Sequence, residues 1–326
     1  MASQPLTIWC NAEFPEAALA LLREGVRGHR LIFAAQRSAS VLASGAPDPA
    51  LAEANVAFGQ PDPQSVLDAP EIAWIQLTTA GYTRYDNDAF WEGLIFRGAM
   101  MSNSSQVFAE PCAEHALAFL LAQARQLPQA FDVQRRDRSW PSLPLRANCR
   151  LLHGQKILLL GYGAIARRLV EMLAPFRMDV RILRRQTMGD ESGRVIAPED
   201  LERTLSEVDH VMNILPDSPA TRRFIDLAKF AAMKPGAVFY NIGRGTTVDQ
   251  DALLEALTSG KLAAAYLDVT EPEPLPPEHP LWTAPNCFIT PHTAGGFADE
   301  PEALVRHFLA NFERFVAGAD LEDRII

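Results

Sequence analysis

The sequence predicts an α/β protein built on doubly wound parallel sheets, and three observations support this fold class. Short apolar runs alternate with helix-like segments along most of the chain, as in strand–helix–strand units. One of the apolar runs ends on the pattern Gly-x-Gly-x-x-Ala, the phosphate-binding turn of dinucleotide-binding folds. The length of 326 residues indicates two domains rather than one.

Composition narrows the class of partner. The formal net charge of −10 argues against binding to nucleic acid or to an anionic membrane surface. We find no apolar run of membrane-spanning length and no signal peptide at the N-terminus. The four cysteines lack metal-ligand spacing, so we predict reduced thiols, no metal site and a cytoplasmic protein.

The first 80 residues read as alternating strands and helices. Apolar runs predict strands at 6–10, 31–35 and 72–77, and Pro15 suits the first turn of a helix that extends to Glu24. The third strand opens into the small residues Thr79, Ala80 and Gly81, whose backbone N–H groups can face an anion such as a carboxylate. An ordinary turn would use the same residues, and without further context it is the simpler interpretation.

A long helix follows at 103–127, with apolar residues at helical spacing, and it is predicted to link the two domains. His115 lies in this helix, where a single histidine is more often a polar or core residue than a catalyst. Pro141 and Pro144 mark the end of an arm before the next strand.

The dinucleotide pattern lies between a buried strand at 157–160 and an amphipathic helix. Gly161 permits the tight turn, Gly163 lets the backbone approach a pyrophosphate, and Ala166 lets the helix pack closely on the sheet. Ala164 and Ile165 begin that helix, and its free N–H groups and dipole favour the pyrophosphate.

The residues after the second strand, 180–183, bear on the choice of dinucleotide. An NAD site usually has Asp or Glu about 20 residues after the first glycine, bonded to the ribose 2′-hydroxyl. Here Arg184 and Arg185 begin 23 positions after Gly161. Guanidinium groups attract a 2′-phosphate, so we predict NADP (as NADPH) in preference to NAD, which remains possible. The alternative is a solvated arginine pair at a strand end.

The alternation continues to the C-terminus. Strands are predicted at 208–215, 237–242, 263–269 and 287–290, and helices at 227–233, from Ala252 to Gly260, and at 302–316. Pro216 begins a loop that faces the cofactor if the carboxyl ends of the strands form the site.

Three of these strands lead into Arg244, Glu273 and His292. The carboxyl ends of parallel strands lie at one edge of the sheet, where ligands bind. Each residue alone has an ordinary interpretation, as a loop cation, a solvated carboxylate or a turn residue. Together, on a nicotinamide-binding fold, an arginine, a carboxylate and a histidine form a set capable of acid–base chemistry on an anionic substrate.

Over nearly its whole length the chain resembles the D-isomer-specific 2-hydroxyacid dehydrogenase family. The resemblance rests on six stretches in the family's order: NSSQVFAEPCAEH from Asn103, GYGAIA from Gly161, LPDSPATR from Leu215, MKPGAVFYNIGRG from Met233, LDVTEPEP from Leu267, and HPLWTAPNCFITPHTAG from His279. It implies a homodimer with two Rossmann-like domains. A cofactor domain at 104–290 would be inserted into a flavodoxin-like substrate domain formed by 1–103 and 291–326.

The resemblance also implies roles for individual residues. Arg244 would grip the carboxylate of a small 2-keto acid, as would the N–H groups of Thr79, Ala80 and Gly81. His292 would donate the proton as the ketone is reduced, and Glu273 beside it would favour the imidazolium and so raise the pKa of His292 above about 6.5. Asp268 would hold the nicotinamide carboxamide, near a backbone carbonyl of Ile242.

The predicted function is therefore NADPH-dependent reduction of a glyoxylate- or hydroxypyruvate-like 2-keto acid to the D-2-hydroxy acid. Two alternatives stay open, namely oxidation of another small anion such as phosphite and a dinucleotide-sensing corepressor-like role without catalysis. Formate-type members carry Gln at the position of Glu273, which disfavours formate. Arg184 departs from the Asp of many members, and Tyr82 and Thr83 depart from a common Val-Asp.

Overall fold

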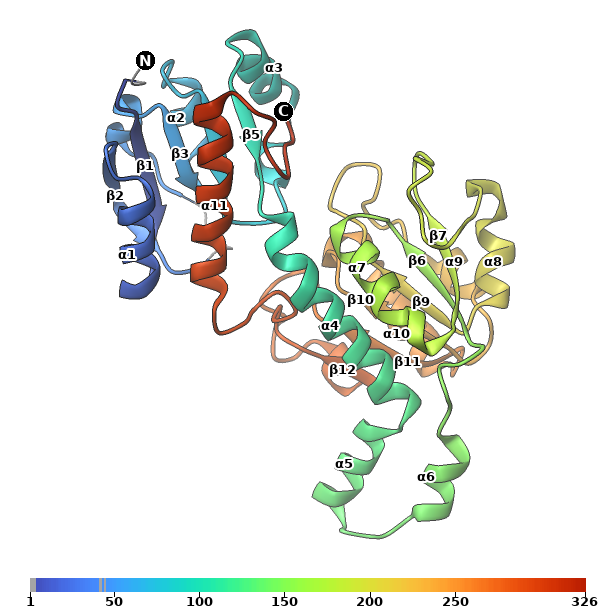
Figure 1. Cartoon of the computed structure of the whole chain (residues 1–326). Coiled ribbons are helices and arrows are strands. Elements are labelled where there is room, and N and C mark those ends of the chain that lie inside the picture. The colour runs from blue at the N-terminus through green and yellow to red at the C-terminus, as the bar shows by residue number, and fades with distance from the viewer. Residues whose placement is uncertain (1–3, 41–42, 44) are drawn as a thin grey trace. The chain divides into compact units, whose positions relative to one another are not determined.

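The computed structural model describes residues 4–40, 43 and 45–326 (Figure 1). The chain forms two compact units. The first comprises Met1–Phe108 and Gly296–Ile326, and the second comprises Ala109–Gly295. The sequence predicts that the chain crosses between the domains after residues 103 and 290. The boundaries between the two compact units lie after residues 108 and 295, five residues later in both cases.

The first unit contains a five-stranded parallel sheet in the order β2-β1-β3-β4-β5, the flavodoxin-like order with a switch point between β1 and β3. Its strands are rich in apolar residues because helices cover both faces. The elements are β1 (Thr7–Ala12), α1 (Glu16–Gly25), β2 (Arg30–Ser38), β3 (Val56–Gly59), α2 (Pro63–Leu67), β4 (Trp74–Leu77), α3 (Asp88–Phe96), β5 (Met100–Ser102) and α11 (Glu300–Ala317).

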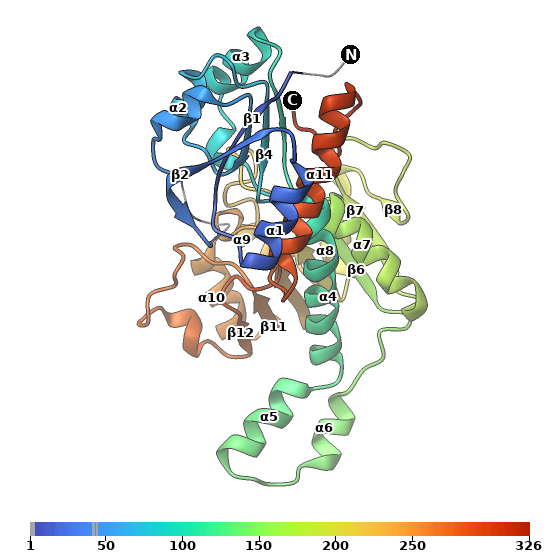
Figure 2. The same cartoon turned by 60° about the vertical axis from the view of Figure 1, so that its left-hand side comes forward.

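Helices α1 and α11 cover one face of this sheet and lie side by side in Figures 1 and 2. Phe308 of α11 stacks on Phe58 of β3 and on Trp74 of β4, with ring centroids 4.2 and 5.4 Å away. Helices α2 and α3 contribute to the core on the other face. A segment from the far end of the chain therefore completes the core of the N-terminal sheet.

The second unit contains a seven-stranded parallel sheet in the order β12-β11-β10-β9-β6-β7-β8. Its strands are β6 (Lys156–Leu160), β7 (Asp179–Leu183), β8 (Arg194–Val195), β9 (His210–Asn213), β10 (Ala237–Asn241), β11 (Leu262–Leu267) and β12 (Cys287–Ile289). This order reverses between β6 and β9, as in the Rossmann fold, and it confirms the predicted fold class.

The helices of the second unit divide between the two faces of its sheet. α7 (Ala164–Leu173) packs on one face with α4 (Ser105–Ala124), a helix that begins in the first unit. The other face is covered by α8 (Leu201–Glu207), α9 (Leu227–Ala232) and α10 (Gln250–Thr258). α5 (Leu127–Arg136) and α6 (Ser142–Asn148) form an arm that extends away from this sheet (Figure 1).

The predicted strands and long helices are present, with ends that shift by up to a few residues. Sequence periodicity missed β3 and β5 and the short helices α2, α3 and α8. It also took the long helix to Leu127, whereas α4 ends at Ala124 and Gln126 adopts a left-handed conformation before α5. Across the described ranges, no helix combines the length and apolarity needed to span a bilayer.

Candidate active site

The turn between β6 and α7 has the geometry expected for a pyrophosphate. Gly161 adopts φ +101°, a conformation that favours glycine. A Cβ placed on Gly163 would meet nothing within 4 Å, so the backbone faces open space there. Gly163 is the N-cap of α7 and no side chain caps the helix, while Ala166 is fully buried against the sheet. The first N–H groups of α7, from Ala164 and Ile165 onward, are thus available to an anion.

Arg184 follows β7, as predicted, but its guanidinium is already paired. Nη1 lies 2.9 Å from Asp190 Oδ1 and 2.5 Å from Glu191 Oε1. Asp190 also contacts Arg167 at 2.5 Å, so one carboxylate bridges two guanidinium groups. Arg185 is exposed and makes no ion pair in the part of the chain that the structure describes. The sequence prediction singled out the two arginines and missed these carboxylates.

The loop after β7 contacts Tyr162, the residue between Gly161 and Gly163. The guanidinium groups of Arg167 and Arg184 each lie 5.5 Å from the ring centre of Tyr162, and the Tyr162 hydroxyl accepts the N–H of Ser192 at 3.0 Å. Glu191 accepts the N–H groups of Met188 and Gly189 at 2.9 and 3.0 Å. The loop after β7 is therefore held by charged contacts rather than by apolar packing.

Arg244 lies three residues after the end of β10, in a turn that requires glycine at the next position, Gly245. A Cβ on Gly245 would lie 1.9 Å from the carbonyl oxygen of Thr270, so the turn packs directly on the backbone that follows β11. Arg244 Nη1 donates to the Gly243 carbonyl at 2.7 Å. This packing brings the segments after β10 and β11 together.

Glu273 and His292 lie in direct contact, from the segments after β11 and β12. Nδ1 of His292 donates to Oε2 of Glu273 at 2.7 Å, and the N–H of Thr270 donates to Oε1 at 2.9 Å. Nδ1 is thus occupied by Glu273, whereas Nε2 has no partner among residues 4–40, 43 and 45–326. The His292 side chain is 25% exposed. His292 also adopts φ 52°, a left-handed conformation that is uncommon for residues other than glycine and is often found at functional sites.

Burial alone would raise the pKa of the Glu273 carboxyl, but its net shift is downward. The hydrogen bonds from His292 and from the Thr270 N–H favour the carboxylate, and so do the charges of His292 and Arg244. Glu273 is thus influenced by both of the other residues that the sequence predicts at this edge of the sheet, His292 and Arg244.

Asp268 directly follows β11 and organises the loop that carries His292. Its buried carboxylate accepts the hydroxyl of Thr290 at 2.6 Å and the N–H groups of Thr293 and Ala294 at 2.9 and 3.0 Å. Its backbone carbonyl accepts the N–H of His292 at 2.9 Å. The sequence prediction gave Asp268 a role toward the cofactor alone and did not anticipate this loop-holding function.

His115 of α4 contacts the same loop. Its Nε2 lies 3.2 Å from the Thr290 hydroxyl and 3.8 Å from Asp268 Oδ1. Burial lowers the pKa of His115, and the nearby Asp268 only partly opposes this effect. A histidine held neutral in this way fits the polar packing role expected for it.

The remaining predicted cofactor residues lie at strand ends of the same sheet. Pro216 is exposed three residues after β9, and its carbonyl accepts the hydroxyl of Thr221 at 2.6 Å. Ile242 follows β10, is buried, and donates its N–H to the Asn213 carbonyl at 3.1 Å. In the ranges described, no cluster of His, Cys, Asp and Glu has a geometry that would hold a metal ion.

Thr79, Ala80 and Gly81 lie in the first unit, where they begin two residues after the end of β4. Gln60, which the sequence prediction missed, donates from Nε2 to the hydroxyls of Thr78 and Thr79 at 3.2 and 3.0 Å. None of the N–H groups of residues 79–81 donates to a group in the described ranges. This loop therefore presents donors that have no acceptor among the described residues, as an anion-binding loop would.

Comparison with known proteins places the chain in a family. Residues 117–294 match the sequence model of the D-isomer specific 2-hydroxyacid dehydrogenase NAD-binding domain. The human glyoxylate reductase/hydroxypyruvate reductase is 36% identical over 60% of each chain. Glyoxylate/hydroxypyruvate reductase B of Pectobacterium atrosepticum is 32% identical over 75% of this chain and 77% of the relative.

A solved structure agrees with these sequence matches. A probable 2-hydroxyacid dehydrogenase from Rhizobium etli, in complex with NADP, HEPES and L(+)-tartaric acid, is 25% identical. It superposes with a TM-score of 0.78 and covers 99% of this chain and 98% of its own. The fold, the nicotinamide-dinucleotide fingerprint and these relatives agree, and the chain belongs to the D-isomer specific 2-hydroxyacid dehydrogenase family of oxidoreductases.

Proposed function

We propose that this dehydrogenase reduces a small 2-keto acid of the glyoxylate or hydroxypyruvate type to the D-2-hydroxy acid, with NADPH as the reductant. The contact between His292 and Glu273 carries the proposal, because it fixes an imidazole with a free Nε2 at the edge of a dinucleotide-binding sheet. The names of the human and Pectobacterium relatives support this substrate class.

Bound NADPH would be the source of the hydride, and the residues of the chain supply the proton and the charge. His292 donates its Nε2 proton to the carbonyl oxygen as negative charge develops there. Glu273 orients the imidazole through Nδ1 and stabilises its protonated form. After product release the imidazole takes up a proton from solvent.

The substrate carboxylate needs cationic and N–H partners. Arg244 is proposed to bind it through the nitrogens that the Gly243 carbonyl does not occupy. The N–H groups of Thr79, Ala80 and Gly81, which have no acceptor in the described ranges, are also proposed to bind the substrate carboxylate. On this basis the first unit is the substrate domain and the second is the cofactor domain.

The cofactor residues are proposed from the geometry of the second unit. Gly161, Gly163, Ala164 and Ile165 would hold the pyrophosphate at the N-terminus of α7. The remaining contacts would come from the segments after β9, β10 and β11, at Pro216, Ile242 and Asp268. Gly163 faces open space of the kind a pyrophosphate needs, so the chain fits this cofactor.

Preference for NADPH is proposed to depend on Arg185 more than on Arg184. Arg184 is neutralised by Asp190 and Glu191, whereas Arg185 is exposed beside it. The bound NADP of the Rhizobium etli relative supports this cofactor.

A homodimer is proposed from the arm of the second unit. The arm and its flanking segments expose large apolar side chains, among them Phe131, Trp140, Leu143 and Leu151, with Trp140 90% exposed. We take these side chains to be the surface that the partner subunit would cover.

The four cysteines are free thiols, which supports a reducing compartment such as the cytoplasm.

The test is oxidation of NADPH and of NADH, followed by absorbance, with glyoxylate, hydroxypyruvate, pyruvate and phenylpyruvate. We expect turnover with the smaller acids and a higher kcat/KM with NADPH. Tight NADPH binding without turnover on any of the acids would contradict the proposal and favour a sensing role.

A further inference from the structure

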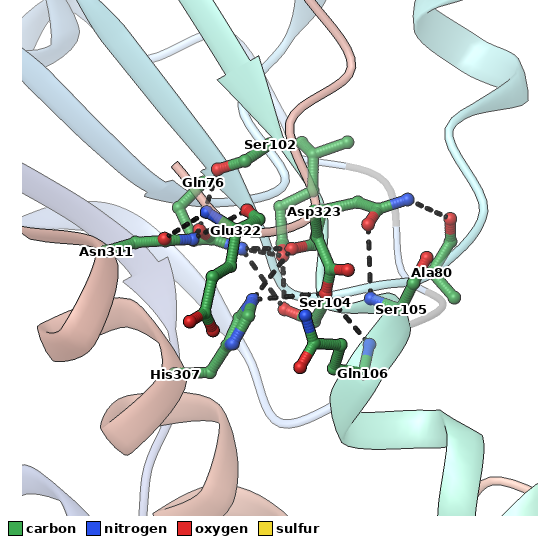
Figure 3. Close-up of polar contacts among 12 residues, drawn as sticks. Gln76, Ala80, Ser102, Ser104, Ser105, Gln106, His307, Asn311, Glu322 and Asp323 are labelled. Atoms are coloured by element: carbon green, nitrogen blue, oxygen red, sulfur yellow. Dashed lines mark hydrogen bonds and ion pairs between the residues drawn. The ribbon is translucent and has the colours of Figure 1, made fainter. Parts of the chain in front are cut away.

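The carboxylate-binding loop proposed above lies against a buried polar network in the first unit (Figure 3). We call it the Asn103 network, after the residue at its centre. Six of its residues, from β4, β5, the segment between β5 and α4, and α11, are at most 9% exposed: Gln76, Ser102, Asn103, Ser104, His307 and Asn311. Asp323 joins them from the C-terminal segment, with a side chain 10% exposed. Buried polar groups in contact with one another are strongly constrained in geometry.

The network holds the carbonyl groups of the loop after β4. Asn103 Nδ2 donates to the Ala80 carbonyl at 2.7 Å, and the Ser104 N–H donates to the Thr79 carbonyl at 3.0 Å. The Thr79 hydroxyl closes the loop on itself by donating to the Gly81 carbonyl at 2.6 Å. The carbonyl groups of all three loop residues therefore accept hydrogen bonds from the chain.

Fixing a carbonyl also fixes the N–H of the following residue. A peptide unit is planar, and its C=O and N–H point in opposite directions. The bond from Ser104 to Thr79 thus directs the Ala80 N–H, and the bond from Asn103 to Ala80 directs the Gly81 N–H. These are two of the N–H groups that have no acceptor in the described part of the chain.

Asn103 is itself held from four sides. Its Oδ1 accepts the N–H of Ser105 at 3.1 Å, which fixes the amide with Nδ2 toward Ala80. Its carbonyl accepts Gln76 Nε2 at 2.6 Å and His307 Nε2 at 3.1 Å. Its N–H donates to the Asp323 carbonyl at 3.1 Å.

The C-terminal segment ties this arrangement to the start of α4. Asp323 Oδ2 lies 3.3 Å from His307 Nε2 and accepts the N–H of Gln106 at 2.8 Å. Asn311 secures the segment further through two bonds with Glu322, at 2.8 and 3.0 Å. The orientation of Asn103 thus depends on residues more than 200 positions away in sequence.

We propose that Asn103 is a positioning residue for substrate binding, which aims the Gly81 N–H at the substrate carboxylate, and that His307 and Asp323 hold Asn103 in place. The inference rests on the proposed role of the loop at residues 79–81. Asn103 does not touch the substrate; it acts through the peptide unit between Ala80 and Gly81.

The decisive variant is Asn103→Asp, which keeps the shape of the side chain and the acceptor for Ser105 but loses the donor to Ala80. A carboxylate oxygen would then face the Ala80 carbonyl, so the peptide unit should turn away. We expect KM for the 2-keto acid to rise about tenfold or more, because the lost hydrogen bond leaves the partly buried Ala80 carbonyl unpaired and releases the peptide unit that carries the Gly81 N–H. The value of kcat should change much less, and the Kd of NADPH, from fluorescence titration, should stay unchanged.

The matched control is Asn87→Asp in the same unit. Asn87 is exposed and caps α3 by accepting the N–H of Phe90 at 3.0 Å, a role that Asp fills equally well. This control should leave KM, kcat and Tm unchanged.

A second variant keeps the proposal testable if Asn103→Asp does not fold. Asp323→Asn preserves the backbone carbonyl that Asn103 uses and removes only the charge beside His307. It should also raise KM, by about twofold to fivefold, as expected for the weakening of one charge-assisted contact.

A folded Asn103→Asp enzyme with unchanged KM would overturn the inference, as would unchanged KM in Asp323→Asn if only that variant folds. Absence of turnover in the unaltered enzyme would instead contradict the proposed function.

Discussion

His292 donates its Nδ1 hydrogen to Oε2 of Glu273 across 2.7 Å, and each residue follows a different strand of the same sheet. The contact fixes which imidazole nitrogen is free, because a carboxylate can only accept at Nδ1. The neighbouring Asp268 fixes the backbone of the same loop at Thr293 and Ala294. Together these contacts hold the free Nε2 in one orientation.

We predict that His292→Ala lowers kcat for keto-acid reduction by about 10²–10⁴-fold, the usual contribution of a positioned general acid. The Kd of NADPH should remain within about twofold, since the phosphate-binding turn is formed by β6 and α7. Stopped-flow turnover and fluorescence titration measure the two quantities. A variant that keeps most of its kcat would show that the proton comes from another group.

We predict that Glu273→Gln narrows the pH range of reduction from the alkaline side. The pKa of the Glu273 carboxyl is lowered in the folded protein. The stabilisation that the ionised carboxylate provides is therefore complete above the ordinary pKa of about 4.3, and it is lost as the pH falls through the lowered pKa. At neutral pH the wild type therefore has the anion that stabilises a protonated imidazole, and the variant lacks it. The measurement is the pH profile of kcat for the wild type and for Glu273→Gln. If activity falls at the same alkaline pH in both proteins, the prediction is contradicted.

We predict that Asp190→Asn tightens NADPH binding several-fold and leaves NADH binding unchanged. Arg167 of α7 and Arg184 pair with Asp190 and Glu191, and the exposed Arg185 adds a third positive charge, so these five groups carry a net charge of +1. Removing one carboxylate raises it to +2, and a 2′-phosphate responds to that charge. The gain should shrink at high ionic strength.

Arg185→Ala should act in the opposite direction. It removes an exposed guanidinium while leaving the pairs of Arg184 intact, so it should weaken NADPH binding and spare NADH. Titration of both cofactors is the measurement. Equal losses for the two cofactors would place the 2′-phosphate elsewhere.

We predict that Arg244→Lys raises KM for the keto acid by about tenfold or more, because an ammonium group lacks the planar fork that binds a carboxylate with two bonds. Arg203→Lys is the matched control. Arg203 forms an exposed ion pair with Asp200 at 2.8 Å, where lysine is an adequate replacement. Equal kinetics for both variants would exclude Arg244 from carboxylate binding.

The fold was predictable because its signals are local. Apolar runs and the Gly-x-Gly-x-x-Ala turn predict β6, α7 and β7 without knowledge of the rest of the chain. Topology also predicts Glu273 and His292 at one edge of the sheet, since parallel strands end there, and the family resemblance implies their direct contact, which the structure contains. Periodicity and topology alone predict the elements and the edge, but not the contact.

What the sequence did not show depends on contacts between distant residues. The pairing of Arg184 with Asp190 and Glu191 requires a loop conformation that no periodicity encodes. The bond from Asn103 to the Ala80 carbonyl joins residues 23 positions apart through a single amide. The short elements β3 and β5 take their place from neighbouring strands rather than from their own composition.

The C-terminal segment described above has a consequence for the order in which the protein forms on the ribosome. Residues 324–326 align antiparallel to β5, and the N–H of Ile325 donates to the Met101 carbonyl at 2.7 Å. The sheet that is translated first is therefore completed by residues translated after the whole of the second unit. The second unit is continuous in sequence and can fold while the first waits for α11 and residues 324–326 to emerge. Chains stalled before α11 has emerged should then hold a folded second unit and an unfinished first unit, the species that chaperones and proteases would meet.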